Sequence, residues 1–137
     1  MIVYITGPMT GYDDYNRKAF YDAEIELDRE GFTVINPAKM PMTMDDKQYM
    51  PICIAMVEQA DAVYALKGWQ NSIGALTEIT YAYRQNKKVI VRHDDGSFTA
   101  EERNALCMPS LKVDSCDYKT EKEAIEVWNR RIEDEQN

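Results

Sequence analysis

The feature that most constrains the fold is a regular alternation of short β-rich runs with longer segments of helical apolar spacing. Helices are predicted over residues 15–30, 45–59 and 72–86. The β-rich runs that flank these helices are Ile2–Thr6, Phe32–Asn36, Asp61–Leu66 and Lys88–Val91. Strands that alternate with helices of this length form right-handed βαβ units. We therefore expect an α/β fold with a parallel sheet that is covered by helices on both faces.

The size and composition of the chain indicate an ordinary globular domain. A length of 137 residues suits one core, and we expect a single domain over residues 1–137. No apolar run approaches the length of a membrane span, and the first residues lack the basic-then-apolar pattern of a signal peptide. These features predict a cytoplasmic protein without a membrane partner.

Charge and cysteine content exclude several classes of partner. The formal net charge of −8 argues against DNA or RNA, because no stripe of lysine and arginine exists to displace the counterions of a polyphosphate. A small ligand, anionic or not, is compatible with this charge, since a helix N-terminus can hold one phosphate. The cysteines have no C-x-x-C spacing, so they indicate neither a disulfide framework nor a zinc site. We interpret all of them, Cys53, Cys107 and Cys116, as free thiols.

The apolar spacing also predicts which face of each helix is buried. The buried face of the first helix should carry Ala19, Phe20, Ala23 and Leu27, with Gly31 as its C-terminal cap. The buried face of the second should carry Ile52, Met56 and Val57. The buried face of the third should carry Ile73, Leu76, Ile79 and Tyr83.

Beyond Arg92 the alternation stops and the pattern is less informative. A polar turn is predicted at His93–Gly96, and Thr99 and Glu102 have the spacing of a helical capping box. The remaining predictions are an edge strand at Leu111–Val113, a capping box at Thr120 and Glu123, and a terminal helix striped by Ile125, Trp128 and Ile132.

Two loops leave predicted strands at the edge where open parallel sheets bind ligands, beyond the carboxyl ends of the strands. The expected sheet is flavodoxin- or Rossmann-like, with about four or five strands. The first loop, Gly7–Gly11, has glycines that allow close approach of the backbone to a ligand and a hydroxyl on Thr10. The second loop is Gly68–Ser72, where Asn71 or Ser72 can cap the next helix and leave N–H groups free for an anion.

Each of these features also has a purely structural interpretation. The first loop can be an ordinary turn, and Ser72 can serve only as an N-cap. Trp69 could stack on a base or a sugar, but loop aromatic residues more often pack on their own protein. Both loops nevertheless share one edge of the predicted sheet with an acidic residue, which favours a binding cleft there.

That acidic residue, Glu78, is the candidate catalytic group of the third helix. No basic residue lies three or four positions away, so no local ion pair is expected. Ala75 and Ala82 share its face of the helix, and their small side chains leave room beside the carboxylate. An ionised carboxylate in such a place can attack an electrophilic sugar carbon or stabilise an oxocarbenium-like transition state.

Three segments together resemble the nucleoside 2-deoxyribosyltransferase superfamily, which also contains the 2′-deoxynucleoside 5′-monophosphate N-glycosidases. These segments are Tyr4–Gly11, Asp61–Tyr64 and the spaced set Ser72, Gly74, Glu78 and Ala82. The likeness is greater to a branch common in phages and prophages that is largely of unassigned function, and it covers residues 2–91. Membership would imply cleavage or transfer at the N-glycosidic bond of a nucleoside or its 5′-monophosphate.

The resemblance also implies roles for individual residues. Glu78 would be the catalytic carboxylate and Tyr4 an active-site tyrosine, while Ser72 would contact a phosphate. The other substrate-binding candidates are Gly7, Pro8, Met9, Thr10, Gly11, Trp69 and Asn71. Members of the superfamily work without metal or organic cofactor and as homodimers or larger assemblies. The implied partners are therefore a small nucleoside or nucleotide and further copies of the chain.

One departure from the superfamily pattern bears on activity. The superfamily places an aspartate eight residues before the aspartate that opens the third strand, and Cys53 stands there in this chain. A thiol matches a carboxylate neither as a hydrogen-bond acceptor nor as an acid. Asp46 lies two helical turns before Cys53 and is an alternative acid on a similar face. The departure leaves open a catalytically impaired module that binds or sequesters nucleotides.

Overall fold

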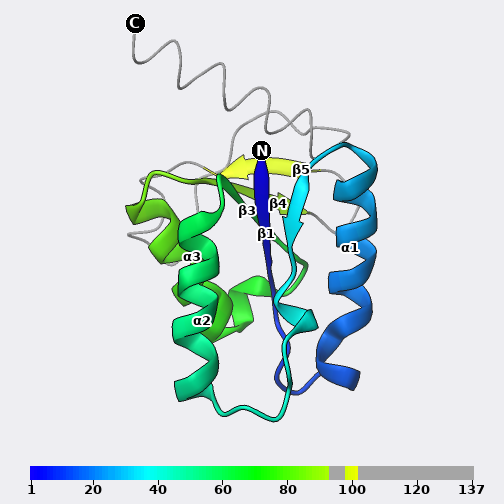
Figure 1. The fold of residues 1–137 in the computed structure, drawn as a ribbon, viewed down its shortest axis with the longest axis vertical. Helices are drawn as coiled ribbons and strands as arrows, with labels where there is room; N and C mark the ends of the chain where they lie inside the picture. Colours follow the sequence, from blue (N-terminus) through cyan, green and yellow to red (C-terminus); the bar gives the residue numbers. More distant parts are fainter. Residues whose placement is uncertain (93–97, 102–137) are drawn as a thin grey trace, which may run out of the picture.

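The structure of the chain is a computed structural model that describes residues 1–92 and 98–101. Its strands are β1 (Ile2–Thr6), β2 (Thr33–Ile35), β3 (Ala62–Ala65), β4 (Lys88–Arg92) and β5 (Phe98–Glu101). Within these described ranges the strands form one sheet in the order β2-β1-β3-β4-β5, with β1 to β4 parallel (Figure 1). The predicted α/β fold is thereby confirmed. This order is the flavodoxin-like one, and it reverses between β1 and β3.

The fifth strand differs from the prediction of a parallel sheet. β5 runs antiparallel to β4, and only residues 93–97 connect the two. A connection this short permits an antiparallel pair but not the crossover that a parallel pair requires. Thr99 was predicted to begin a capping box, but it lies inside β5 opposite Val91, because pairing with the sheet outweighs a local capping signal. The predictions for 93–96, 111–113 and 120–132 lie outside the described residues.

The helices of the described residues begin at the carboxyl edge of the sheet and cover both of its faces. They are α1 (Arg17–Arg29), α2 (Asp46–Gln59) and α3 (Ile73–Arg84), with short 3-10 segments at Asp13–Asn16, Pro37–Lys39 and Trp69–Asn71. Asp45 caps α2 with a complete capping box, and Ser72 caps α3. Gly31 has a φ of +92° just after α1, as expected of a C-terminal cap.

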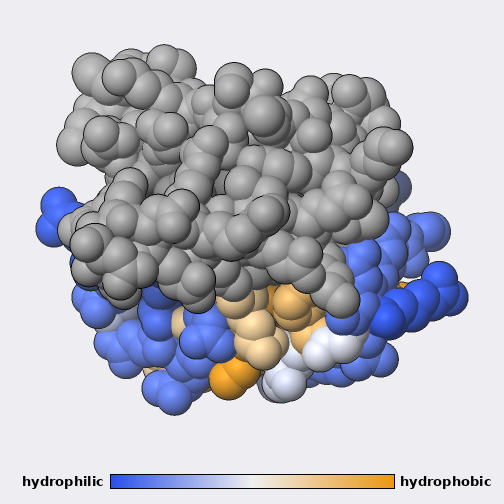
Figure 2. Space-filling model, turned by 90° about the horizontal axis from the view of Figure 1, so that it is seen from above, coloured by the Kyte–Doolittle hydropathy of each residue, from blue (hydrophilic) through white to orange (hydrophobic). Residues whose placement is uncertain are grey.

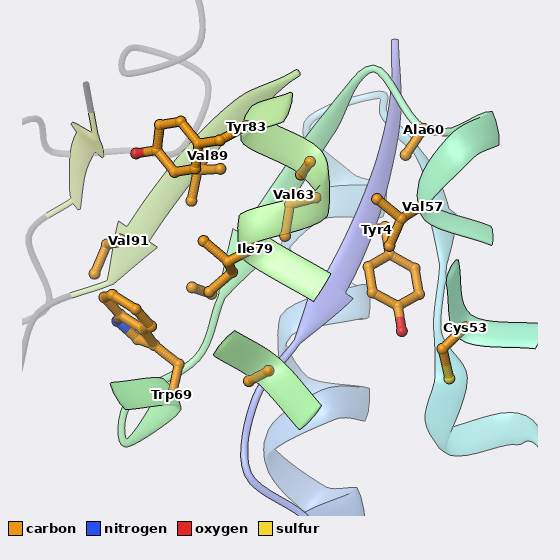
Figure 3. Close-up of a cluster of buried hydrophobic side chains, with 13 residues drawn as sticks. Tyr4, Cys53, Val57, Ala60, Val63, Trp69, Ile79, Tyr83, Val89 and Val91 are labelled. Atoms are coloured by element: carbon orange, nitrogen blue, oxygen red, sulfur yellow. The ribbon is translucent and has the colours of Figure 1, made fainter. Parts of the chain in front are cut away.

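The sheet separates two hydrophobic clusters. Below one face, α1 packs Phe20, Ala23 and Leu27 against alternate residues of β1 and β3. On the other face, α2 and α3 pack against the opposite residues of the same strands (Figure 1). Figure 3 shows this second cluster, in which Tyr4 lies beside α2 and Trp69 lies beside Val91. Because side chains alternate across a strand, Tyr4 and Thr6 of β1 both face the second cluster.

Two helices are rotated relative to the predicted faces. In α2, Val57 is buried as predicted, but Ile52 is 43% exposed and Cys53 is fully buried. In α3, Ile73 is 84% exposed, and Leu76 is also exposed. Ile79 and Tyr83 are buried against the sheet as predicted, but the residues buried beside them are Ala75, Glu78 and Ala82. The small alanines allow α3 to approach the sheet closely, and this rotation carries Glu78 to the end of β1.

On the face drawn in Figure 2, the visible surface of the described residues is largely hydrophilic. Figure 2 shows it from above, with a small hydrophobic group between hydrophilic side chains. Across residues 1–92 and 98–101, no helix combines the length and the apolar character needed to cross a bilayer.

Candidate active site

Glu78 lies at the centre of a polar cluster between α3 and β1. It is 6% exposed, and each of its carboxylate oxygens accepts a hydrogen bond from a different residue of the strand. The Tyr4 hydroxyl donates to Oε1 at 3.0 Å, and the Thr6 hydroxyl donates to Oε2 at 2.6 Å. Hydrogen bonds to both oxygens fix the orientation of the carboxylate at the β1/β3 switch point.

Burial changes the acidity of this carboxyl group. Loss of solvation raises the pKa of Glu78 from 4.5 to about 7. Hydrogen bonds from Thr6, Tyr4 and Cys53 act in the opposite direction, because they stabilise the ionised form. Glu78 is therefore divided between its protonated and ionised forms near neutral pH, a property that buried catalytic carboxyl groups share.

Tyr4 serves this cluster as a hydrogen-bond donor. It is fully buried, and burial together with the charge of Glu78 raises the pKa of its phenol well above the ordinary value. A phenol with a raised pKa keeps its proton throughout the physiological range. Tyr4 thus remains able to donate to the carboxylate whichever form Glu78 takes.

Cys53 lies beside Tyr4 and Glu78. Figure 3 shows Tyr4 and Cys53 as neighbours on β1 and α2, and the thiol is fully buried. Burial and the charge of Glu78 raise the pKa of Cys53 to about 12, so it is a neutral thiol and not a nucleophilic thiolate. Asp46, the alternative acid, is exposed in the first turn of α2. Of the two, only Cys53 is brought to the carboxylate.

The two loops predicted to bind substrate contact each other. Pro8 is buried, and a Cβ added at Gly68 would lie 3.3 Å from its Cγ. The same Cβ would lie 2.9 Å from the Tyr12 hydroxyl, and Gly68 has a φ of +87°. Glycine at position 68 therefore allows the first loop to cross the end of β3. Thr10 and Gly11 are exposed at the outer side of this loop.

Gly7 is required by a close approach of the same kind. A Cβ added there would lie 2.8 Å from the Cβ of Leu66. We expect Gly7→Ala to lower the free energy of unfolding by about 1–3 kcal/mol, the usual cost of overpacking a core. Urea unfolding would measure this loss, with Thr10→Ala as the exposed control in the same loop. Equal stability of the Gly7 variant and the wild type would contradict the expected clash.

The second loop holds one candidate in the core and two near the start of α3. Trp69 is 4% exposed and packs in the second cluster, so the packing interpretation fits it and a stacking surface does not. The Ser72 hydroxyl accepts a hydrogen bond from the backbone N–H of Ala75 at 3.2 Å, and Asn71 is exposed. Ser72 is thus an N-cap whose hydroxyl already has one partner.

Two residues of this region were missed by the sequence analysis. Thr6 follows Tyr4 by two positions on a strand, and this spacing alone places both on one face. Tyr49 precedes Cys53 by four positions on α2, which is the spacing of one helical face. The Tyr49 hydroxyl donates to the carbonyl of Pro37 at 2.8 Å and lies 3.5 Å from the Met9 sulfur. It thereby joins α2 to the first loop.

Comparison with known proteins identifies the fold and the family of the chain. The structure is similar to that of the 2-desoxiribosyltransferase from Leishmania mexicana, with a TM-score of 0.56 and 15% sequence identity over 93% of this chain and 95% of that one. The chain therefore has the α/β fold of the deoxyribosyltransferases. No curated protein matches its sequence. Residues 1–91 match the family described as a domain of unknown function (DUF4406), and the chain belongs to that family.

Proposed function

We propose that the protein cleaves or transfers the N-glycosidic bond of a deoxynucleoside or its 5′-monophosphate. The observation that carries this proposal is the carboxylate of Glu78, buried at the switch point of the sheet and held by two hydroxyl groups. Such a group can serve as a nucleophile at C1′ or stabilise the oxocarbenium-like transition state. The likeness of fold to a deoxyribosyltransferase supports the same reaction class.

The hydrogen bonds around Glu78 suit either role. In its ionised form the carboxylate presents negative charge to the developing positive charge at C1′, while Tyr4 and Thr6 hold its orientation. As the bond to the base breaks, its electron pair leaves with the base. Water or a second base then accepts the sugar, and the proton that this acceptor loses is balanced by the proton that the departing base gains. We assign Tyr4 and Thr6 as positioning residues for this step.

The remaining substrate contacts are proposed from their places near the end of β1 and the start of α3. The first loop supplies Gly7, Pro8, Met9, Thr10 and Gly11, and the start of α3 supplies Asn71 and Ser72. The backbone N–H groups of these residues other than Pro8, and the hydroxyl groups of Thr10 and Ser72, are suited to the oxygens of a sugar or its phosphate. Assembly into a homo-oligomer and a place in a phage or prophage setting are further parts of this proposal.

A second candidate function is a module that binds nucleotides without cleaving them. The observation that favours it is Cys53, whose thiol is neutral beside Glu78 and cannot act as the acid that an aspartate would supply. In this case the same cleft would retain its ligand intact. The two functions differ in one measurable product, the free base.

The test combines two measurements on the wild-type protein. The four 2′-deoxynucleosides and their 5′-monophosphates are incubated with it, and free base is quantified by chromatography. Binding of the same compounds is measured in parallel by calorimetry. Release of base supports the glycosidic reaction, whereas tight binding with intact ligand recovered supports sequestration. If no compound is cleaved or bound, both functions are wrong.

Thr6 offers a prediction on the pH dependence of this reaction. Thr6→Val removes the hydroxyl that stabilises ionised Glu78, so the pKa of Glu78 should rise above its value of about 7. A hydrogen bond to a charged group contributes about 1.5–3 kcal/mol, so the activity profile should move to higher pH by about one unit or more. Thr6→Ser, which keeps the hydroxyl, should retain the wild-type profile. Identical profiles for all three proteins would exclude this role of Thr6.

A further inference from the structure

A cation at the start of α1 lies beside the first loop. Arg17 is the first residue of α1, and it follows Asp14, Tyr15 and Asn16, which all have positive φ. The side-chain amide of Asn16 donates to the carbonyl of Pro8 at 2.9 Å. This hydrogen bond joins the segment with positive φ, residues 14–16, to the loop that follows β1. It therefore fixes the start of α1, where Arg17 lies, beside that loop.

The guanidinium of Arg17 has an N–H group without an acceptor. Its Nε is buried and has no hydrogen-bond partner among the described residues. The nearest carboxylate oxygen recorded for it is that of Asp14, 3.9 Å from Nε, and the Asp14 side chain is 77% exposed. This distance is too long for a hydrogen bond, and an exposed pair of this kind contributes little. A buried N–H without an acceptor is costly, so an incoming acceptor would be favoured here.

Tyr49 connects this guanidinium with the candidate active site. Burial raises the pKa of Tyr49 well above its ordinary value, and the negative charge of ionised Glu78 also raises it. The charge of Arg17 acts on the same phenol in the opposite direction. The phenol is therefore within electrostatic reach of both Glu78 and Arg17. The Tyr49 hydroxyl lies against Pro37 and Met9, so it joins α2 to the first loop, and Arg17 begins the helix that Asn16 ties to the same loop at Pro8.

We infer that Arg17 binds an anionic group of the substrate, and that this group is the phosphate monoester of a 2′-deoxynucleoside 5′-monophosphate. The inference rests on the proposed function for the nature of the sugar and the base. The phosphate contact is argued from Arg17 itself. The planar fork of a guanidinium matches two phosphate oxygens. A neutral nucleoside has no group that needs this charge, and a chain with a net charge of −8 would otherwise repel a phosphate dianion.

The experiment compares two substitutions that remove the same charge from adjacent positions. Arg17→Gln removes the guanidinium, and Lys18→Gln removes an ammonium that is 90% exposed and paired with Asp22. For each protein, kcat/KM for base release is measured on 2′-deoxynucleosides and on their 5′-monophosphates at one ionic strength. Arg17→Gln should lose about 100-fold on the monophosphates and less than about threefold on the nucleosides. Lys18→Gln should match the wild type on both.

Two further features keep the result independent of folding and of turnover. The ratio of activity on monophosphates to activity on nucleosides is measured within one protein, so a smaller folded fraction does not change it. The conservative variant Arg17→Lys, which keeps the positive charge, should give an intermediate ratio. Calorimetry on Glu78→Gln, with and without Arg17→Gln, measures binding of the monophosphate, the nucleoside and inorganic phosphate. Arg17-dependent binding of the monophosphate, stronger than that of inorganic phosphate, is the expected result.

The possible outcomes separate this inference from the proposed function. Base release that depends on Arg17 only for monophosphates supports both. Equal losses on nucleosides and monophosphates, or a wild type that prefers nucleosides, would overturn the role of Arg17 and leave the glycosidic reaction standing. Arg17-dependent binding without release of base would support the anion site and refute the reaction. If the monophosphate binds equally well without Arg17, or does not bind, the inference is wrong.

Discussion

Glu78→Gln is expected to abolish release of the base while the fold is kept. The glutamine side chain has nearly the same shape, and its oxygen can still accept the hydrogen bond from Tyr4. It has no negative charge to attack C1′ or to stabilise an oxocarbenium ion, however. Loss of an essential catalytic charge costs several kcal/mol of transition-state stabilisation, so kcat/KM should fall by about three orders of magnitude or more.

The measurement is chromatographic detection of free base over hours, with Glu58→Gln as the matched control. Glu58 is an exposed residue of α2, so its substitution removes one carboxylate outside the polar cluster. The control should retain wild-type activity. Turnover by Glu78→Gln within tenfold of the wild type would remove Glu78 from the mechanism and would favour another acid.

The same substitution should stabilise the protein at alkaline pH. Below a pH of about 4.5 Glu78 is protonated in both the folded and the unfolded chain, and its ionisation contributes nothing to the difference between them. Between pH 4.5 and about 7 the unfolded chain is ionised while the folded chain resists ionisation, so stability is lost over this range, and above about 7 the loss is complete. The shift from 4.5 to about 7 corresponds to about 3 kcal/mol, since one pKa unit is about 1.4 kcal/mol.

The glutamine of the Glu78→Gln variant does not ionise, so this variant does not lose stability in this way as the pH rises. Its free energy of unfolding should therefore exceed that of the wild type by about 3 kcal/mol at pH 8–9, and the difference should diminish toward pH 4.5. Urea unfolding at a series of pH values measures the two proteins side by side, which cancels the titration of all other groups. A difference that does not change with pH would mean that the pKa of Glu78 is not raised.

Much of the fold was accessible from the sequence because its signals are local and repeated. β-rich runs, helical spacing and capping residues such as Asp45 and Gly31 mark each element within a few residues of its observed bounds. A parallel sheet with such elements places the loops after β1 and β3 at one edge. The candidate cleft therefore follows from the order of the elements and requires no knowledge of side-chain contacts.

The details of the cluster were less accessible because they depend on packing. Apolar spacing assigned Ile73 and Leu76 to the buried face of α3, but the close approach of the sheet selects the face with alanines and Glu78. The hydrogen bond from Thr6 joins residues 72 positions apart, and no local pattern specifies it. The burial of Trp69 likewise depends on its neighbours in the second cluster.

The contact between the two loops has a consequence for how this protein can vary. Pro8 and Tyr12 lie over Gly68 so closely that no larger side chain fits at that position without displacing them. A change in either connection must therefore be accommodated by the other. Among descendants of this chain, substitutions at positions 8, 12 and 68 should therefore arise together.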